Sequence, residues 1–329
     1  MIKKEKTLYK SGRKNPDGYK FNSFQVIEKR WAKFVVYILV PLSFFISILD
    51  FFNVVSWDSL YSSLGIINTI KKQDSNFAIY YLDVGQSDCT VIVCDDKVMM
   101  VDTGTFHQVY KIRTALHELN IDTIDYMVIT HQHDDHMSGA AEIINHYNVS
   151  NIIMPKLSGI NSVESDTYSN LIKAISKKNI NAISVSAGDI FNLGSSCIEI
   201  LSPAVQDKEL NNMSIVFKLS YYDTKFLFQG DADKSIEQQI LKSDFDISAD
   251  LIKLGHHGSK TSSYAPYLDE VAPEYAVISC NWDNNYGHPS FPVVERLLER
   301  NITPYITSLD GNIIVTSDGT EINIFSLKN

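Results

Sequence analysis

The segment Thr130–His136 constrains this chain more than any other, because it places three histidines and two aspartates within seven residues (THQHDDH). It directly follows the apolar run Tyr126–Ile129, which predicts a buried strand. Neutral imidazole nitrogens and carboxylate oxygens are ligands that a divalent cation such as zinc takes in proteins. Burying so many ionisable groups without a cation would cost roughly 1–3 kcal/mol for each group left without a partner. The sequence therefore predicts a metal site at a strand end.

Spacing within this segment indicates two neighbouring sets of ligands. His131 and His133 alternate with Gln132, so that both side chains can project together from an extended strand end. Asp135 and His136 follow where we expect the chain to turn into a helix.

The composition is that of a globular protein, with 329 residues of which 44% are hydrophobic, enough for one large or two modest domains. The four cysteines form no CxxC pair, which argues against a thiolate zinc site or a redox pair. Cys89 and Cys94 lie in one predicted strand region, and their separation of five places them on opposite faces. We expect both to be core residues.

An uncharged apolar run, Phe34–Leu49, precedes the rest of the chain and resumes beyond Asp50. It predicts a single transmembrane helix over residues 34–55, because a span needs about 20 mainly apolar residues. The alternatives are a buried core helix or a cleaved signal peptide. More than thirty mainly polar residues precede the run, which argues against the signal peptide.

Charge predicts the orientation of this anchor. Residues 1–33 hold ten Lys or Arg and three acidic residues, a net charge of +7, so that the remainder of the chain carries −17. By the positive-inside rule the basic segment stays in the cytoplasm. We therefore expect a single-pass protein of the cell membrane with cytoplasmic residues 1–33, an anchor at 34–55, a linker at 56–76 and an extracellular domain at 77–329.

Strands and helices alternate through this last part, which predicts a layered α/β architecture. No internal repeat is evident. The predicted strands are 77–84, 89–94, 98–101, 126–129, 198–201, 214–221, 226–229, 251–254, 275–279 and 313–316, and the predicted helices are 110–119, 140–147, 234–241 and 293–299.

Three further segments at predicted strand ends carry metal-binding or catalytic residue types. Asp231 follows the strand FLFQG, whose glycine permits a tight turn. His256 and His257 follow LIKLG, and His288 stands between glycine and proline in NNYGHP. The other three histidines, His107, His117 and His146, are interpreted as ordinary surface or core residues.

Taken in order, these motifs resemble the metallo-β-lactamase-fold superfamily: VDTG at 101–104, HxHxDH at 131–136, GD at 230–231 and HHGS at 256–259. A narrower set is similar to the ComEC-like branch, which includes competence DNA-uptake proteins, and to phosphodiesterases such as phosphorylcholine esterase. This set comprises LDVGQSD at 82–88, NNMS at 211–214, FQGDAD at 228–233, HHGSKTSS at 256–263 and NNYGHP at 284–289. The resemblance, from residue 77 to residue 328, implies an αββα sandwich.

The resemblance also implies roles for individual residues. His131 and His133 would bind one divalent ion, Asp135 and His136 its neighbour, and Asp231 would bridge the two. Either His256 or His257 would complete the second site, and spacing does not decide between them. Asp102 matches a buried carboxylate that orients the histidine loop. Further candidates for outer-shell or substrate contacts are Asp83, Gln86, Asp88, Asn211, Asn212, Ser214 and Ser259.

This sequence departs from the family in two respects. Many members carry another ligand histidine between HxHxDH and the bridging aspartate, where this chain has helical His146 and the NNMS segment. One metal site is therefore expected to be weak. ComEC has several membrane spans, whereas one is predicted here, so this chain is not expected to transport DNA alone.

The implied reaction is metal-dependent hydrolysis of a phosphodiester by two-metal activated water, with Asp135, Asp231 and His288 as catalytic residues. Zinc or manganese fits the ligand types. Single-stranded DNA is the favoured substrate, although the net charge of −17 opposes binding to DNA and Lys253 and Lys260 near the histidines help only locally. The alternatives are a phosphodiesterase of cell-envelope polymers or small molecules and a catalytically impaired, tethered binding module. Natural substrate, protein partners, oligomeric state and pathway are left open.

Overall fold

The computed structural model describes residues 35–51, 70–155, 166–204 and 209–327. The chain divides into two compact units, Met1–Ser63 and Leu64–Asn329. The first includes a π-helical turn, η1 (Val35–Leu39), that continues into helix α3 (Val40–Phe51). Among the residues described, no helix combines the length and apolar character needed to cross a membrane. The predicted span 34–55 is thus not confirmed, and its remaining residues, 34 and 52–55, lie outside the described residues, as do 1–33 and 56–69.

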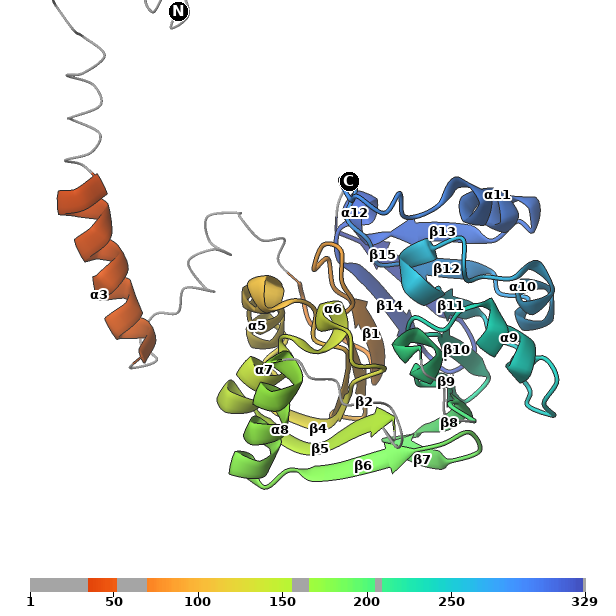
Figure 1. Cartoon of the computed structure of the whole chain (residues 1–329), viewed down its shortest axis with the longest axis horizontal. Helices are drawn as coiled ribbons and strands as arrows, with labels where there is room; N and C mark the ends of the chain where they lie inside the picture. Colours follow the sequence, from red (N-terminus) through yellow and green to blue (C-terminus); the bar gives the residue numbers. More distant parts are fainter. Residues whose placement is uncertain (1–34, 52–69, 156–165, 205–208, 328–329) are drawn as a thin grey trace, which may run out of the picture. The chain divides into compact units, whose positions relative to one another are not determined.

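The second unit is built on two sheets (Figure 1). The eight-stranded sheet runs in the order β15 (Ile322–Ser326), β14 (Ile313–Ser317), β1 (Phe77–Tyr81), β2 (Thr90–Cys94), β3 (Lys97–Val101), β4 (Thr123–Val128), β5 (Asn148–Pro155) and β6 (Asn181–Val185). The seven-stranded sheet runs in the order β13 (Thr303–Ile306), β12 (Tyr275–Ile278), β11 (Leu251–Lys253), β10 (Thr224–Phe228), β9 (Val216–Tyr221), β8 (Ser196–Ser202) and β7 (Ile190–Leu193).

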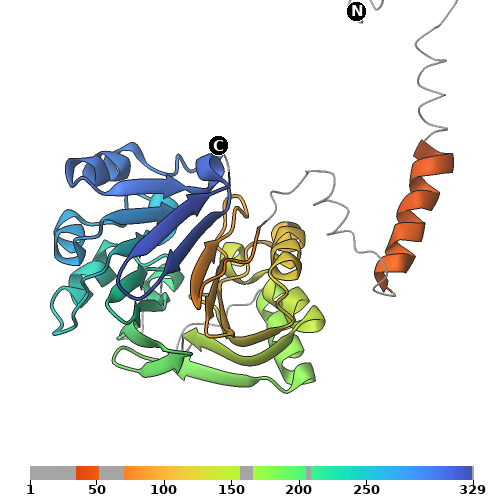
Figure 2. The same ribbon diagram turned by 180° about the vertical axis from the view of Figure 1, so that it is seen from behind.

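Helices cover the outer face of each sheet, as the views from the front and from behind both show (Figures 1 and 2). The eight-stranded sheet is covered by α5 (Val109–Glu118), α7 (Ala140–His146) and α8 (Asp166–Lys178). The seven-stranded sheet is covered by α9 (Lys234–Ile240), α10 (Ala265–Val271) and α11 (Phe291–Glu299). This arrangement is the expected αββα sandwich.

Alternation along the strands explains why the sandwich has three cores. In β1, Ala78 and Tyr80 pack toward α5, α7 and α8, whereas Ile79 and Tyr81 pack between the two sheets. The third core lies under α9, α10 and α11. Cys89 belongs to the first core and Cys94 to the second, so the prediction that they occupy opposite faces is confirmed.

The predicted strands and helices of this unit are all present, with shifts of a few residues at their ends. The apolar pattern did not predict β5, β6, β7, α8, α10, α12 (Thr307–Asp310), β13 or β15. Several of these strands lie at sheet edges and are half exposed, for example β6 and β15, so that their apolar alternation is weak. Ile70, assigned to the linker at 56–76, is buried in the first core.

Parallel pairing places the loops that carry the candidate residues at one edge of the sandwich. Strands β3, β4 and β5 are parallel in one sheet, and β10, β11, β12 and β13 are parallel in the other. The carboxyl ends of parallel strands lie at the same edge, which is where open α/β sheets bind ligands. The segments after β4, β10, β11 and β12 contain THQHDDH, Asp231, the histidine pair and His288, respectively.

Candidate metal centre

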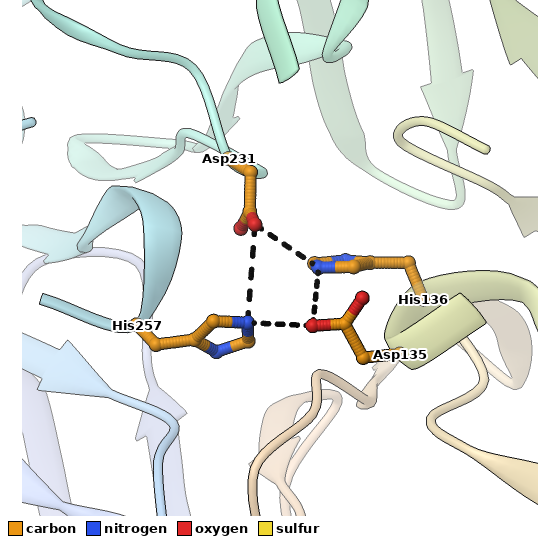
Figure 3. A group of neighbouring side chains, drawn as sticks. All are labelled: Asp135, His136, Asp231 and His257. Atoms are coloured by element: carbon orange, nitrogen blue, oxygen red, sulfur yellow. Dashed lines mark hydrogen bonds and ion pairs between the residues drawn. The ribbon is translucent and has the colours of Figure 1, made fainter. Parts of the chain in front are cut away.

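Four side chains from both halves of the sandwich come together at this edge: Asp135, His136, Asp231 and His257 (Figure 3). Each offers one ligand atom, and these atoms lie within 4.8 Å of one another. The Nε2 atom of His257 is 3.1 Å from Oδ2 of Asp135 and 3.8 Å from Oδ2 of Asp231. The Nε2 atom of His136 is 3.8 Å and 3.4 Å from the same two carboxylate atoms. We call this group the four-residue cluster.

Short, tightly turned segments hold these residues. Asp135 and His136 lie in the single-turn helix α6 (Asp134–Met137). Asp231 follows Gly230, which has a φ of 52° and whose added Cβ would lie 3.0 Å from the Cβ atoms of Ser214 and Thr130. Glycine is therefore required there, both for its positive φ and for this close approach. The cluster depends on a turn that no larger residue would make without displacing its neighbours.

The histidine pair lies in η4 (Gly255–Gly258) with φ values of 50° for His256 and 55° for His257. This left-handed region is sparsely populated by residues other than glycine and costs on the order of 1–3 kcal/mol per residue. The turn directs the two rings differently. His257 has its Nδ1 2.9 Å from the carbonyl oxygen of Ser279, which leaves Nε2 facing the cluster. His256 has its Nδ1 3.2 Å from Oγ1 of Thr261 and its Nε2 3.9 Å from Asp231.

The other histidine pair of the motif lies beside the cluster. The Nε2 atom of His131 is 3.0 Å from Nδ1 of His133 and 3.9 Å from Oδ2 of Asp231. The rings of His131 and His136 have centroids 4.1 Å apart. Asp231 thus lies next to both pairs of the HxHxDH motif. Within the described ranges, His131 and His133 are in neither of the two groups arranged to hold a metal ion.

Asp102 supports the motif from behind, as the resemblance implied. Its Oδ2 is 2.8 Å from Nδ1 of His136, and its Oδ1 accepts a hydrogen bond of 2.8 Å from the backbone N–H of Thr130. The hydroxyl of Thr130 donates to Asp102 and lies 3.1 Å from Nδ1 of His131. A carboxylate in this position fixes the ring orientation of a ligand histidine. It directs Nε2 of His136 into the cluster.

A buried ion pair lies on the far side of His257. Lys253 Nζ is 2.9 Å from Oδ2 of Asp88, and these side chains are only 5% and 7% exposed. Oδ1 of Asp88 is 3.7 Å from Nδ1 of His257. Lys253 was predicted from the sequence to help locally in binding DNA. The structure corrects this, because a lysine buried at the end of β11 and paired with Asp88 does not face a ligand in solvent.

Burial and mutual charge displace the pKa values of the clustered groups. Burial alone would raise the pKa of Asp135 and Asp231, but the neighbouring histidines outweigh it and lower both. Burial opposes protonation of His136 and His257, yet the surrounding carboxylates raise the pKa of each ring. Burial, with the adjacent His136, lowers the pKa of His131. Burial also raises the pKa of Asp102 against the influence of His136.

These residues fit a divalent cation. Nε2 of His136 and Oδ1 of Asp231 are buried and make no hydrogen bond, although buried polar atoms nearly always have a partner. Both belong to a set of two imidazoles and two carboxylates, which suits a borderline cation such as zinc. A cation coordinated there would supply a partner to both atoms, neither of which makes a hydrogen bond within the protein.

The remaining predicted residues lie around this centre at different depths. Ser214 Oγ accepts a hydrogen bond of 3.0 Å from the backbone N–H of Asp231. Gln86 contacts His288, with 3.5 Å between Nε2 and Nδ1. Oγ of Ser259 is 3.1 Å from Oγ1 of Thr261. Asp83 accepts a hydrogen bond of 3.4 Å from the N–H of Gly85 and lies outside the four-residue cluster. Asn211 and Asn212 lie in η3 (Leu210–Met213), directly before Ser214.

Two contributors were missed by reasoning from the sequence. The carbonyl of Ser279, after β12, orients His257, and the Thr130 hydroxyl links Asp102 to His131. A backbone carbonyl has no side-chain signature, so nothing in the sequence could have identified Ser279. Thr130 could have been found from its position in the motif, between the strand and the first histidine.

Comparison with known proteins agrees with this geometry. The profile of the Metallo-beta-lactamase superfamily matches residues 82–166. The chain is 29% identical over 194 residues to "ComE operon protein 3" of Bacillus subtilis, which covers 59% of this chain and 24% of that protein. It is 28% identical over 243 residues to "Recombination protein 2" of Haemophilus influenzae, and this match covers 71% of this chain and 28% of that protein. "Competence protein ComA" of Neisseria gonorrhoeae is 24% identical over 241 residues, covering 72% and 32%.

Each match spans a third or less of the relative's own length. Among solved structures, a mutant of the β-hydroxylase CmlA aligns with a TM-score of 0.52 at 12% identity, covering 75% of this chain and 55% of that one. This likeness concerns the fold alone. The profile and the three relatives confirm the resemblance to the metallo-β-lactamase superfamily and its ComEC-like branch.

Proposed function

We propose that this chain, a metallo-β-lactamase-superfamily hydrolase of the ComEC-like branch, hydrolyses phosphodiesters with two divalent cations and acts on single-stranded DNA. The observation that carries the proposal is the position of Asp231, which lies within 4 Å of His136 and His257 in the four-residue cluster and of His131 beside it. A carboxylate shared in this way can serve two cations at once.

Each side chain then has a defined task. Asp135, His136 and His257 would hold one ion, His131 and His133 would hold the second, and Asp231 would be shared by both. Such a pair of ions would lower the pKa of a bound water and neutralise the charge of the phosphodiester. Asp102 and the Ser279 carbonyl keep the rings of His136 and His257 oriented. His256 lies outside the four-residue cluster, with its Nδ1 3.2 Å from Oγ1 of Thr261 and its Nε2 3.9 Å from Asp231.

His288 acts as a hydrogen-bond donor rather than as an acid. Partial burial and the adjacent His257 and His256 lower the pKa of His288 to about 4, so its ring is neutral at pH 7. A neutral imidazole still donates one N–H. The side-chain Nε2 of Gln86 lies 3.5 Å from one of the two ring nitrogens of His288, Nδ1. We assign to His288 the donation of a hydrogen bond to a phosphate oxygen of the substrate, and not the protonation of the leaving group.

Metal content and hydrolysis test the proposal together. Full-length protein purified without chelator should retain divalent metal and, with Zn²⁺ or Mn²⁺ added, should cleave bis(p-nitrophenyl) phosphate and single-stranded DNA. Cleavage of the small diester without cleavage of DNA would redirect the proposal to small-molecule or envelope phosphodiesters. If the protein held less than one tightly bound ion and cleaved neither substrate, it would be a binding module and the proposal would be wrong.

The membrane anchor remains a separate proposal. Its support is the uncharged run from Phe34 to Leu49 and the charge difference between residues 1–33 and the rest of the chain. In the described part of this run, Tyr37, Phe44 and Phe45 are exposed apolar side chains. Protease added to intact cells is expected to remove the C-terminal domain, whereas complete protection would reverse the proposed orientation.

A further inference from the structure

One loop next to the metal centre carries large exposed aromatic side chains. Trp282 and Tyr286 are each 72% exposed, and both lie in the segment 279–290, which we call the rim loop, between β12 and α11. Exposed Trp and Tyr rings placed next to a candidate active site indicate an interaction surface. Neither residue has a part in the proposed hydrolysis.

Near-parallel rings connect the rim loop to the metal centre. The Tyr286 and His288 rings have centroids 5.7 Å apart and planes inclined by 22°. The His288 and His257 rings are 6.3 Å apart and inclined by 25°. These separations lie within the range of offset-stacked aromatic pairs. Since His257 belongs to the four-residue cluster, a row of three rings leads from that cluster to the exposed Tyr286.

Hydrogen bonds hold the rim loop in this conformation before any ligand arrives. Asn284 Oδ1 accepts from the backbone N–H groups of Tyr286 and His288, at 3.1 Å and 3.0 Å. From the other half of the sandwich, Gln86 Oε1 accepts from the N–H of Asn281 at 3.1 Å. A planar ligand stacking on Tyr286 therefore meets a surface that is already ordered, which reduces the entropy lost on binding.

We propose that the rim loop is a stacking site for a nucleobase of the nucleotide next to the cleaved phosphate, with Tyr286 as the platform and Trp282 as a second contact. This inference rests on the proposed function and specifies how its substrate is held. Aromatic stacking binds bases of any sequence, because every base presents a π face.

Charge favours a nucleobase as the occupant over a contact with phosphates. The rim loop contains no Lys or Arg and one acidic residue, Asp283, and the chain after residue 33 carries a net charge of −17. Binding of nucleic acid through phosphates alone would need cationic side chains. Stacking supplies affinity that does not depend on positive charge, which explains how an acidic protein could hold DNA beside its metal ions.

The test compares a short oligo(dT) with an abasic oligomer of the same length, backbone and fluorescent label. Binding to the full-length protein is measured by anisotropy in EDTA, which stops metal-dependent cleavage. We expect the protein to bind oligo(dT) more tightly, by roughly 5- to 150-fold per stacked base. Tyr286→Ala should lose most of this preference, Trp282→Ala part of it, and Tyr286→Phe, which keeps the ring, should retain it.

Tyr222→Ala is the matched control. Tyr222 is 67% exposed but lies at the turn between β9 and β10, at the opposite end of β10 from Asp231. Equal binding of the two oligomers by the unmodified protein, or equal losses in Tyr222→Ala and Tyr286→Ala, would overturn the inference. Oligo(dT) binding that is unchanged in both Tyr286→Ala and Trp282→Ala would also overturn it, because the exposed rings would then contact something other than a base.

These outcomes are separable from those for hydrolysis. A protein that cleaves bis(p-nitrophenyl) phosphate but shows no preference for oligo(dT) retains the proposed chemistry and lacks the base site. A protein that prefers oligo(dT) but cleaves no diester has the base site without the chemistry.

Discussion

The two halves of the metal centre are built differently. In the four-residue cluster, the Nδ1 of each imidazole has a hydrogen-bond partner that orients the ring. This partner is Asp102 for His136 and the Ser279 carbonyl for His257. In the other half, the Nε2 of His131 contacts the Nδ1 of His133 at 3.0 Å, so that the two rings are each other's neighbours. The first half brings together ligand atoms from four residues, whereas the second offers two imidazole nitrogens beside the shared Asp231.

This difference agrees with the absence from the sequence of a further ligand histidine between the HxHxDH motif and Asp231. His146, the histidine between the motif and Asp231, lies on α7 with its Nδ1 2.9 Å from the carbonyl of Glu142 and 3.4 Å from that residue's side chain. Ser214, from NNMS, contacts the backbone of Asp231 and supplies no imidazole. We therefore expect the four-residue cluster to bind its ion tightly and the His131–His133 pair to bind weakly.

Asp231→Asn should have the largest effect, since this carboxylate is adjacent to both halves. We expect loss of metal from both and a fall in kcat/KM well beyond the 10- to 100-fold typical of outer-shell partners. Metal analysis and diester hydrolysis measure this. Asp134→Asn, in the same motif but exposed, is the control and should change neither. Unaltered turnover in Asp231→Asn would contradict the shared position of this residue.

The comparison of His257→Asn with His256→Asn tests the cluster alone. His257→Asn should remove the tightly bound ion, leaving one fewer divalent ion per chain, because its Nε2 faces Asp135. His256→Asn should keep that ion. Equilibrium dialysis with zinc gives both stoichiometries. The reverse pattern would show that His256 is the ligand.

The buried Lys253–Asp88 pair joins the two halves of the sandwich beside His257. Lys253→Met leaves Asp88 buried without its cation, which should lower the free energy of unfolding by about 3–5 kcal/mol. Metal affinity should fall roughly 10- to 100-fold, because Asp88 and His257 would lose their arrangement. Denaturant unfolding and zinc titration measure the two effects.

Two variants calibrate this prediction. The double variant Asp88→Asn/Lys253→Met should recover part of the lost stability, since no unpaired charge remains. Lys97→Met breaks an ion pair of equal length, 2.9 Å, whose lysine side chain is 57% exposed, and should cost at most about 1 kcal/mol. Similar losses in Lys97→Met and Lys253→Met would mean that the buried pair has no special role.

Metal binding should release protons, and this is the smallest effect that we expect. The carboxylates raise the pKa of His136 and His257 in the metal-free protein, so both rings bind protons at a higher pH than an ordinary histidine. Their contribution to metal-free stability is therefore present at low pH and lost as pH rises through the raised values. A divalent ion must displace those protons, so metal affinity should rise with pH.

Calorimetry in two buffers of different ionisation enthalpy counts the released protons. His136→Asn should reduce the number, and His146→Asn, on the exposed face of α7, should not. Binding with no proton release at pH 7 would show that carboxylates do not hold these rings protonated.

Much of the site was predictable because its chemistry is carried by short motifs. His131, His133, Asp135 and His136 lie within six residues, and Asp231, His257 and His288 each follow a strand that the apolar pattern identified. The edge strands β6 and β15 escaped prediction, because their half-exposed residues lack a strong alternation. The burial of Lys253 was also missed, because a lysine at a strand end is ordinarily exposed.

The sequence by itself determined the layered α/β class, the residue types at the strand ends and the absence of a further ligand histidine in the expected interval. Only the tertiary structure decided that His257 and not His256 faces Asp135, because consecutive residues differ in direction through backbone angles that spacing does not reveal. It also decided that Asp88 pairs with Lys253 across 165 residues and that Tyr286 continues a row of rings from the metal centre. These contacts join segments distant in sequence, so they exist only once the two sheets have packed.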